Sequence, residues 1–172
     1  MAYPQQLSIL KKQTIQKPNW KIDRIDIEPF EQMPKGLFIG VDPGTVHLGI
    51  CILWETQVTL FQCYITRDDN PIIRMQDAQK VITECVHSYP YNATVCIEGA
   101  SFGDKYRQVE LAEQRASIAL WALHRNFEVK IVPPNTIRKK VFLNAKVKAH
   151  EVWDNVPQDC AAALSCALSL SL

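Results

Sequence analysis

The sequence GLFIGVDPGTVHLG, residues 36–49, decides the fold class of this chain. Residues 37–41 are apolar or glycine, Asp42 follows them directly, and Pro43-Gly44 is a dipeptide that reverses the chain direction. A short run without polar residues is typical of a strand that is buried on both faces. This stretch therefore predicts a buried strand that ends in a carboxylate and is followed by a turn.

The rest of the chain predicts alternating strands and helices. Further strands are expected at residues 47–54, 58–65, 93–98 and 128–132. Helices are expected at residues 71–87 and 105–126 and from Pro157 onward, with short helices and loops over 135–154. Three early strands followed by alternating helices and strands indicate an α/β fold with a mixed five-stranded sheet flanked by helices.

Residues 1–35 differ from the remainder of the chain. They contain four prolines and show little hydrophobic periodicity, and five basic residues precede Asp26 against a single acidic residue. This composition predicts an N-terminal basic arm that is partly ordered at best, ahead of a domain over residues 36–172. Both a tail without a role and an arm that touches DNA are compatible with it.

Composition limits the function classes only weakly. The chain has 172 residues and a formal net charge of +1, so bulk charge neither implies nor excludes a polyanionic partner. The six cysteines form no C-x-x-C pair and lie within apolar runs, which indicates reduced thiols in a reducing compartment. No apolar run approaches the roughly 20 residues of a membrane span, and the polar N-terminus lacks a signal-peptide core. We expect an intracellular, cytoplasmic protein that does not bind membranes.

Four acidic residues stand out by their positions. Asp42 and Glu98 each end a predicted strand, Asp159 opens the last helix, and Asp154 precedes it. Asp42 also suits a turn, and Asp159 suits a helix N-terminus, where a carboxylate is stabilised by the macrodipole. If the two strands are neighbours, about 4.8 Å apart, Asp42 and Glu98 repel each other unless a cation lies between them. Oxygen ligands at this spacing suit Mg²⁺ or Mn²⁺, whereas the scattered histidines do not suit zinc.

Four segments, in order along the chain, resemble the motifs of the RuvC family of Holliday-junction resolvases. They are residues 39–45 (IGVDPGT) with Gly49, residues 96–98 (CIE) with Phe102 and 114–116 (QRA), residues 132–139 (VPPNTIRK) with the loop 144–149 (NAKVKA), and residues 157–164 (PQDCAAAL). A lone DPGT motif is not specific, because actin-like kinases and chaperones carry a similar phosphate loop. Four motifs in register over residues 36–172 are specific.

This resemblance implies an RNase H-like fold, a homodimer and metal-dependent cleavage of four-way or other branched DNA by paired nicks. Motif position implies that Asp42, Glu98 and Asp159 bind Mg²⁺, for which Mn²⁺ is expected to substitute. By the same comparison, Lys146 or Lys148 neutralises charge at the reacting phosphate, and we expect Lys148 to be the catalytic one.

Ala162 is the main departure from the family pattern. The family has another metal ligand one helical turn after the first acid of the last motif, which here is Asp159. Three explanations stay open: a deliberate replacement of aspartate, a natural variant that uses Asp154 or His150 instead, or a binding protein that no longer cuts.

A basic stretch accompanies the predicted acidic site. Residues 129–150 contain six lysines and arginines and no acidic residue, which suits phosphate binding, although a solvated charged face explains the same pattern. We also expect Phe102 to stack on an unpaired base and two cations to hold phosphate at the start of the long helix. The expected DNA-binding residues are Lys105, Arg107, Phe102, Arg138, Lys139, Lys140 and Lys146.

Two other functions fit the motifs. A junction-binding protein without cleavage agrees with Ala162. A related RNase H-like nuclease that acts on RNA also fits, because no feature of the sequence identifies a contact to the 2′-hydroxyl and thereby distinguishes DNA from RNA. An actin-like phosphotransferase needs a second lobe and a second glycine-rich loop, for which 172 residues with six glycines leave no room. The sequence preference of cleavage and a cellular or phage origin cannot be derived from these residues.

Overall fold

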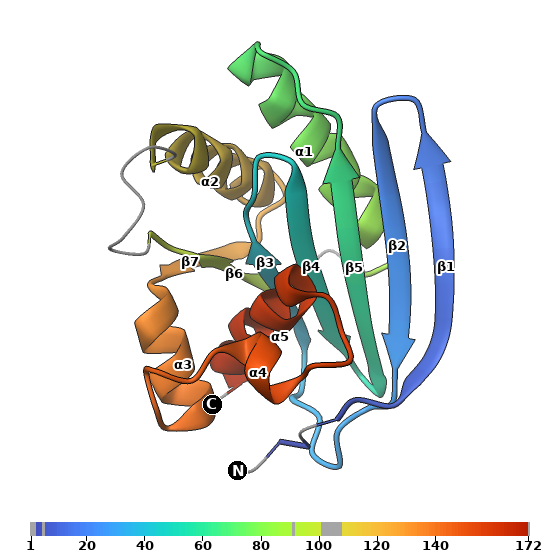
Figure 1. Ribbon diagram of the computed structural model, residues 1–172, viewed down its shortest axis with the longest axis vertical. Helices are drawn as coiled ribbons and strands as arrows, with labels where there is room; N and C mark the ends of the chain where they lie inside the picture. The colour runs from blue at the N-terminus through green and yellow to red at the C-terminus, as the bar shows by residue number, and fades with distance from the viewer. Residues whose placement is uncertain (1–2, 5, 91, 101–107, 172) are drawn as a thin grey trace.

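The computed structural model describes residues 3–4, 6–90, 92–100 and 108–171, and it contains one mixed sheet with helices on both faces (Figure 1). The strands are β1 (Ile9–Lys17), β2 (Trp20–Ile27), β3 (Leu37–Asp42), β4 (His47–Trp54), β5 (Gln57–Ile65), β6 (Ala93–Glu98) and β7 (Glu128–Val132). The helices are α1 (Pro71–Val86), α2 (Gln108–Leu123), α3 (Pro134–Phe142), α4 (Ala149–Val152) and α5 (Gln158–Ser171).

The strand order in the sheet is β1-β2-β5-β4-β3-β6-β7. Strands β3, β6 and β7 are parallel neighbours, whereas the other neighbours are antiparallel. The prediction of a mixed sheet flanked by helices is confirmed. Its strand number was wrong, since the sheet has seven strands and not five.

The two additional strands come from residues 9–27, within the segment expected to be a partly ordered arm. Strand β1 is exposed at all nine positions, so it has no buried residues that could produce an alternating pattern. Strand β2 is buried at Ile22 on one face and at Ile25 and Ile27 on the other, which also conceals its period of two. The pairing of β2 with β5 and of β1 with β2, rather than hydrophobic alternation, therefore identifies these strands.

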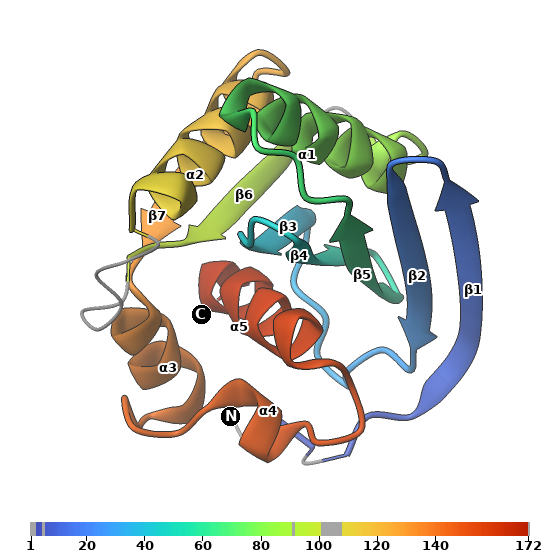
Figure 2. The ribbon, with the colours of Figure 1, turned by 45° about the horizontal axis from the view of Figure 1, so that its top comes forward.

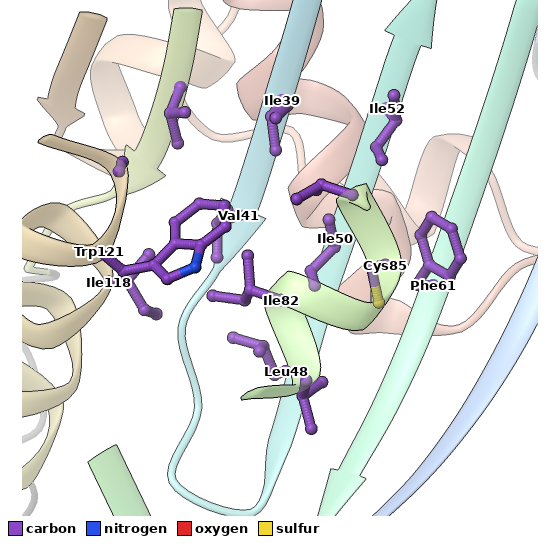
Figure 3. Close-up of a cluster of buried hydrophobic side chains, with 14 of the residues drawn as sticks. Ile39, Val41, Leu48, Ile50, Ile52, Phe61, Ile82, Cys85, Ile118 and Trp121 are labelled. Atoms are coloured by element: carbon purple, nitrogen blue, oxygen red, sulfur yellow. The ribbon is translucent and has the colours of Figure 1, made fainter. Parts of the chain in front are cut away.

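The helices divide between the two faces of the sheet, as Figure 2 shows: α1 and α2 cover one face, and α3, α4 and α5 lie against the other. Figure 3 shows the first core, in which Ile82 of α1 and Trp121 of α2 lie near Val41 of β3, whereas Cys85 of α1 lies near Phe61 of β5. All of these side chains are at most 4% exposed. Because residues 39 and 41 point toward α1 and α2, the alternate residues 40 and 42 point toward α5.

Helix α5 approaches the sheet closely because two glycines lie beneath it. A Cβ atom at Gly40 of β3 would lie 1.9 Å from the carbonyl oxygen of Ala163, and one at Gly49 of β4 would lie 2.1 Å from the carbonyl oxygen of Asp159. No side chain fits at either position without movement of the helix. The glycines therefore fix α5 across the ends of β3 and β4, with its N-terminus beside Asp42.

The N-terminal residues contact the loop that precedes α5. The Trp153 indole is fully buried, and its Nε1 donates a hydrogen bond to the carbonyl oxygen of Pro4 at 2.8 Å. Asn155 exchanges hydrogen bonds with the backbone N–H and carbonyl of Leu7, which is itself buried. These contacts close the lower end of the second core, which lies between the sheet and helices α3–α5.

All six cysteines are buried and free. Among the residues that the structure describes, no helix combines the length and the apolar character needed to cross a bilayer.

Candidate functional site

The parallel pairing of β3 with β6 brings Asp42 and Glu98 to the same edge of the sheet. The register pairs Val41 with Ile97, so the two acids are the last residues of adjacent strands. Their carboxyl groups are within hydrogen-bonding distance of each other. A hydrogen bond between two carboxyl groups requires a shared proton, and a bridging cation replaces that proton when both groups ionise.

Burial raises the pKa of Asp42 well above its ordinary value, and the charge of Glu98, its hydrogen bond and the charge of Asp159 raise it further. The pKa of Asp159 is also raised by burial, an effect that the nearby His47 partly offsets. The charges of Glu98 and Asp159 thus act on Asp42 at the N-terminal end of α5. Raised pKa values such as those of Asp42 and Asp159 are typical of functional sites.

The first of two hollows beside the acidic pair has a volume of about 250 Å³. Asp42 and Glu98 line it together with Ala162 of α5, and Arg138 of α3 and Lys148 before α4 face it from the other side. Its remaining lining residues are Ile137, Ala149, His150, Gln158 and Ser165. Residues 158, 162 and 165 are spaced at one and two helical turns, so a single face of α5 borders this hollow.

The second hollow, of about 160 Å³, lies on the other side of the acidic pair, toward α2. Asp42 and Glu98 also line it, and Arg115 of α2 and Arg138 contribute the positive charge. Arg138 therefore borders both hollows. An arginine between two such spaces is well placed for bidentate contact with a phosphate group.

The structure resolves part of the question raised by Ala162. This residue lines the first hollow with both strand-end acids, so a side chain at position 162 points toward Asp42 and Glu98. Of the two residues considered as replacements for its missing carboxylate, His150 lines the same hollow, whereas Asp154 is exposed and lines neither hollow.

The residues expected to bind DNA occupy different places. Arg138 and Lys148 face the acidic pair, and Lys139 and Lys146 are exposed. The Nζ atom of Lys140 donates to the carbonyl oxygen of Ser169 at 2.5 Å, so this lysine connects α3 to α5. The expected DNA contacts at Phe102, Lys105 and Arg107 lie outside the described residues.

Arg115 was not among the residues expected at the site. Its place in the Gln-Arg-Ala segment that resembles a family motif was the available signal. Gln158 and Ser165 were also missed, since glutamine and serine are common on helices and their residue type alone does not indicate a binding site.

The described residues contain no cluster of three or more His, Cys, Asp or Glu side chains placed to hold a metal ion. The donor set nevertheless fits a divalent cation in one respect: Asp42 and Glu98 supply adjacent oxygens whose repulsion a cation relieves. Asp159 acts electrostatically on Asp42 but lines neither hollow. The described residues therefore fit a divalent-cation site with two carboxylate ligands, Asp42 and Glu98, and with Asp159 close by.

Replacement of Asp42 by asparagine is expected to stabilise the metal-free protein at pH 8. Because the folded pKa of Asp42 is raised, the stability that this group contributes is present below its ordinary pKa and is lost as the pH rises through the raised value. The asparagine side chain does not ionise, so the variant escapes this loss. Calorimetry in a chelator should show a higher Tm for Asp42→Asn, by about 2 to 4 °C for each kcal/mol gained.

Asp154→Asn is the matched control, because that carboxylate is exposed, and its Tm is expected to stay unchanged. Mn²⁺ should raise the Tm of the unaltered protein and of the control but not that of Asp42→Asn. A Tm for Asp42→Asn at or below that of the unaltered protein in chelator would contradict the mutual repulsion described here.

Comparison with known proteins gives a structural likeness without a sequence match. No protein-family model and no curated protein matches the chain. The structure of Thermus thermophilus RuvC is similar over 78% of this chain and 92% of that chain, with a TM-score of 0.58 and 16% identity. The T. thermophilus RuvC structure described as in complex with Holliday junction substrate is similar over the same shares, with a TM-score of 0.60 and 17% identity.

The class that these likenesses define is the RuvC-like version of the RNase H-like fold, a mixed sheet flanked by helices. Among the solved proteins to which this fold is similar is RuvC of Thermus thermophilus.

Proposed function

We propose that this chain is a metal-dependent endonuclease that resolves Holliday junctions by paired nicks. The observation that carries the proposal is the adjacent pair Asp42–Glu98, which borders two hollows lined by Arg115, Arg138 and Lys148. Clustered carboxylates surrounded by cations suit the hydrolysis of a phosphodiester, because the acids hold divalent ions and the cations hold the phosphate.

Asp42, Glu98 and Asp159 are the proposed ligands of Mg²⁺, with Mn²⁺ as a substitute. When bound, divalent ions in such sites activate water and stabilise the leaving oxygen. The chain itself orients the substrate: Arg138 and Arg115 hold the phosphate over the acidic pair, and Lys148 stabilises negative charge that develops during the reaction. Products with a 5′-phosphate and a 3′-hydroxyl are expected.

Branched DNA is the proposed substrate for two reasons. The structure has the fold of a protein whose solved complex contains a Holliday junction. In addition, the positive residues of α3 and of the loop before α4 lie on the same side of the sheet as the acidic pair, so a DNA backbone can be drawn across the site. The proposed location is the cytoplasm of a cell, or of a phage host, where such junctions form.

A homodimer is proposed because α2 exposes an apolar stripe. Val109, Leu120 and Leu123 are 72%, 53% and 54% exposed, and Ala112 and Ala116 lie exposed between them. Exposed apolar faces of this kind mark interaction sites, and small residues allow two helices to approach closely. A second copy of α2 is the proposed occupant, because two identical sites related by a two-fold axis suit paired, symmetric nicks.

The double substitution Leu120→Glu/Leu123→Glu is expected to convert the dimer into monomers, since it places four like charges in a two-fold interface. Sedimentation measurements at micromolar concentration test this. Leu143→Glu is the control, because Leu143 is 82% exposed but lies at the end of α3, away from α2. Dimers that persist in the α2 variant would place the interface elsewhere.

The nuclease proposal is tested with a synthetic four-way junction, the purified chain and Mg²⁺ or Mn²⁺. Paired nicks near the crossover are expected, with Glu98→Gln as the inactive control. Duplex DNA and an RNA–DNA hybrid of equal length serve as competitors, and preferential cleavage of the hybrid would favour the RNA-directed alternative. The nuclease proposal fails if neither this chain nor its Ala162→Asp variant cuts the junction.

Junction binding without cleavage is the second candidate function. The observation that favours it is Ala162 at the position that faces Asp42 and Glu98, where a carboxylate is missing. Under this alternative, the chain binds the junction with a strong salt dependence and leaves it uncut whatever residue occupies position 162.

A further inference from the structure

The helical turn that follows Lys148 is held by packing on one side only. Residues 143–148, which connect α3 to α4, include no buried residue, so packing does not fix the chain ahead of Lys148. Helix α4 has four residues, and the hydrogen bond from the Trp153 N–H to the carbonyl oxygen of Ala149, at 2.9 Å, closes its single turn. A helix this short is not stable by itself. The position of Lys148 therefore depends on the buried residues that come after it.

The buried residues of this turn are Ala149 and Trp153, which are 8% and 0% exposed and belong to the second core. Trp153 ends α4, so a single helical turn connects its indole to Lys148. Lys148 in turn lines the first hollow together with Asp42 and Glu98. A displacement of the indole is thus transmitted to the cation that faces the acidic pair.

The chain near its N-terminus provides the polar partner of Trp153. We call residues 3, 4 and 6–8 the N-terminal segment. The indole Nε1 donates a hydrogen bond to the carbonyl oxygen of Pro4 at 2.8 Å, and the ring of Tyr3 meets the indole edge to face at 6.5 Å. Phe142 of α3 contacts the indole from another side, at 5.3 Å. Because a buried N–H without an acceptor is costly, the hydrogen bond to Pro4 fixes where the indole lies.

Asn155 makes a second attachment to the N-terminal segment. Its Oδ1 accepts a hydrogen bond from the backbone N–H of Leu7 at 3.3 Å, and its Nδ2 donates to the carbonyl oxygen of the same residue. Leu7 is 4% exposed, and the carbonyl oxygen of Ser8 accepts from the N–H of Glu28, directly after β2, at 2.8 Å. The N-terminal segment thus connects the loop after α4 to the sheet.

Helix α5 depends on different contacts. The close approaches at Gly40 and Gly49 fix it against β3 and β4. Loss of the contacts made by Trp153 and Asn155 should therefore move α4 and leave α5 and the acidic pair in place.

We infer that the N-terminal segment positions Lys148 at the acidic site, with Trp153 and Asn155 as the positioning residues. The inference rests on the nuclease function proposed above, in which Lys148 acts on the reacting phosphate. It gives residues 3–8 a role that is neither that of an idle tail nor that of an arm on the DNA. The segment acts on the site through α4.

The test measures how binding to a four-way junction depends on salt, in a chelator so that no cleavage occurs, between about 50 and 200 mM salt. Lys148→Ala should make the slope of log Kd against log salt shallower by about 0.9, because one phosphate contact is lost. Trp153→Phe/Asn155→Ala should give most of the same change in slope and a Kd about 5-fold weaker near physiological salt. The phenylalanine retains an aromatic ring but has no N–H to donate to Pro4.

Trp121→Phe/Asn70→Ala is the matched control on the opposite face of the sheet. Trp121 is 3% exposed, and its Nε1 donates to Oγ1 of Thr83 at 2.9 Å. The side chain of Asn70 accepts from the N–H of Ile72 at 2.9 Å, at the start of α1. This variant also loses one buried indole hydrogen bond and one contact from an asparagine to the backbone. Its Tm should fall, but its salt slope should equal that of the unaltered protein, since a loss of stability does not change the number of phosphates contacted.

A double-mutant cycle tests whether the positioning residues act through Lys148. When Lys148 is already alanine, the further change Trp153→Phe/Asn155→Ala should leave the salt slope and the Kd unaltered. All variants are compared at a temperature at which each is folded.

The outcomes separate this inference from the proposed function. A slope for Trp153→Phe/Asn155→Ala equal to that of the unaltered protein overturns the positioning role and leaves the nuclease proposal intact. The same holds if the control variant changes the slope equally, or if the effects of Lys148→Ala and Trp153→Phe/Asn155→Ala simply add. Failure of the unaltered protein to bind a junction in preference to duplex DNA overturns the proposed function, and this inference with it.

Discussion

Replacement of Ala162 by aspartate is expected to raise the rate of junction cleavage by about 100-fold or more. The side chain at position 162 borders the hollow formed by Asp42 and Glu98, so a carboxylate there adds a third oxygen donor to the pair. Removing groups that merely support a metal site already costs about 10- to 100-fold in affinity or activity, and a direct ligand contributes at least as much. Single-turnover cleavage in Mg²⁺, with enzyme in excess, measures the change directly.

Ala162→Asn is the matched variant, because it has the shape of aspartate without its charge and is expected to cleave no faster than the unaltered chain. The affinity for Mn²⁺, measured by calorimetry, should increase only in the aspartate variant. Equal rates for the Asp and Asn variants would show that position 162 does not contribute a metal ligand.

Replacement of Gly40 by alanine is expected to destabilise the protein by about 3 kcal/mol, at the upper end of the usual cost of overpacking a core. The new methyl group would lie 1.9 Å from the carbonyl oxygen of Ala163 and 2.5 Å from the backbone nitrogen of Ala167. Backbone atoms in a helix cannot rotate aside as a flexible side chain does, so α5 must move as a unit. Denaturant titration followed by tryptophan fluorescence measures the loss.

Gly99→Ala provides a graded control. A Cβ atom at Gly99 would meet the carbonyl oxygen of Val132 at 3.1 Å, a contact that a shift of a few tenths of an ångström relieves. Its cost is therefore expected to be clearly smaller than that of Gly40→Ala. If the two variants lose the same stability, the close approach of α5 to β3 is not what makes Gly40 necessary.

The sequence predicted the elements around the site well because each has a strong local signal. The expected strand at 93–98 coincides with β6, and the helix expected from Pro157 coincides with α5 to within one residue. A run of apolar residues that ends in a carboxylate identified Asp42 and Glu98, and the parallel pairing of their strands then brought them together. These features depend on short segments whose burial leaves a pattern in the sequence.

The features that could not be predicted depend on pairing between distant segments. Strand β1 is exposed throughout, and only its register with β2 makes it a strand. Arg115 reaches the site because α2 lies over the ends of the parallel strands, which no local pattern reveals. Likewise, the hydrogen bond from Lys140 to the carbonyl oxygen of Ser169 joins distant segments and has no local signal, while the expected DNA contact of Lys140 stays a prediction.

The two glycines beneath α5 also limit how this molecule can change over evolutionary time. With carbonyl oxygens of the helix resting directly on the backbone of β3 and β4, the helix can neither slide nor tilt without disrupting the core. The contribution of α5 to the site can therefore change only by exchanges at residues 158, 162 and 165, which border the hollow from a helix of fixed position. At α5, evolutionary change is therefore limited to substitutions of side chains, because the position of the helix backbone is fixed by its contact with the sheet.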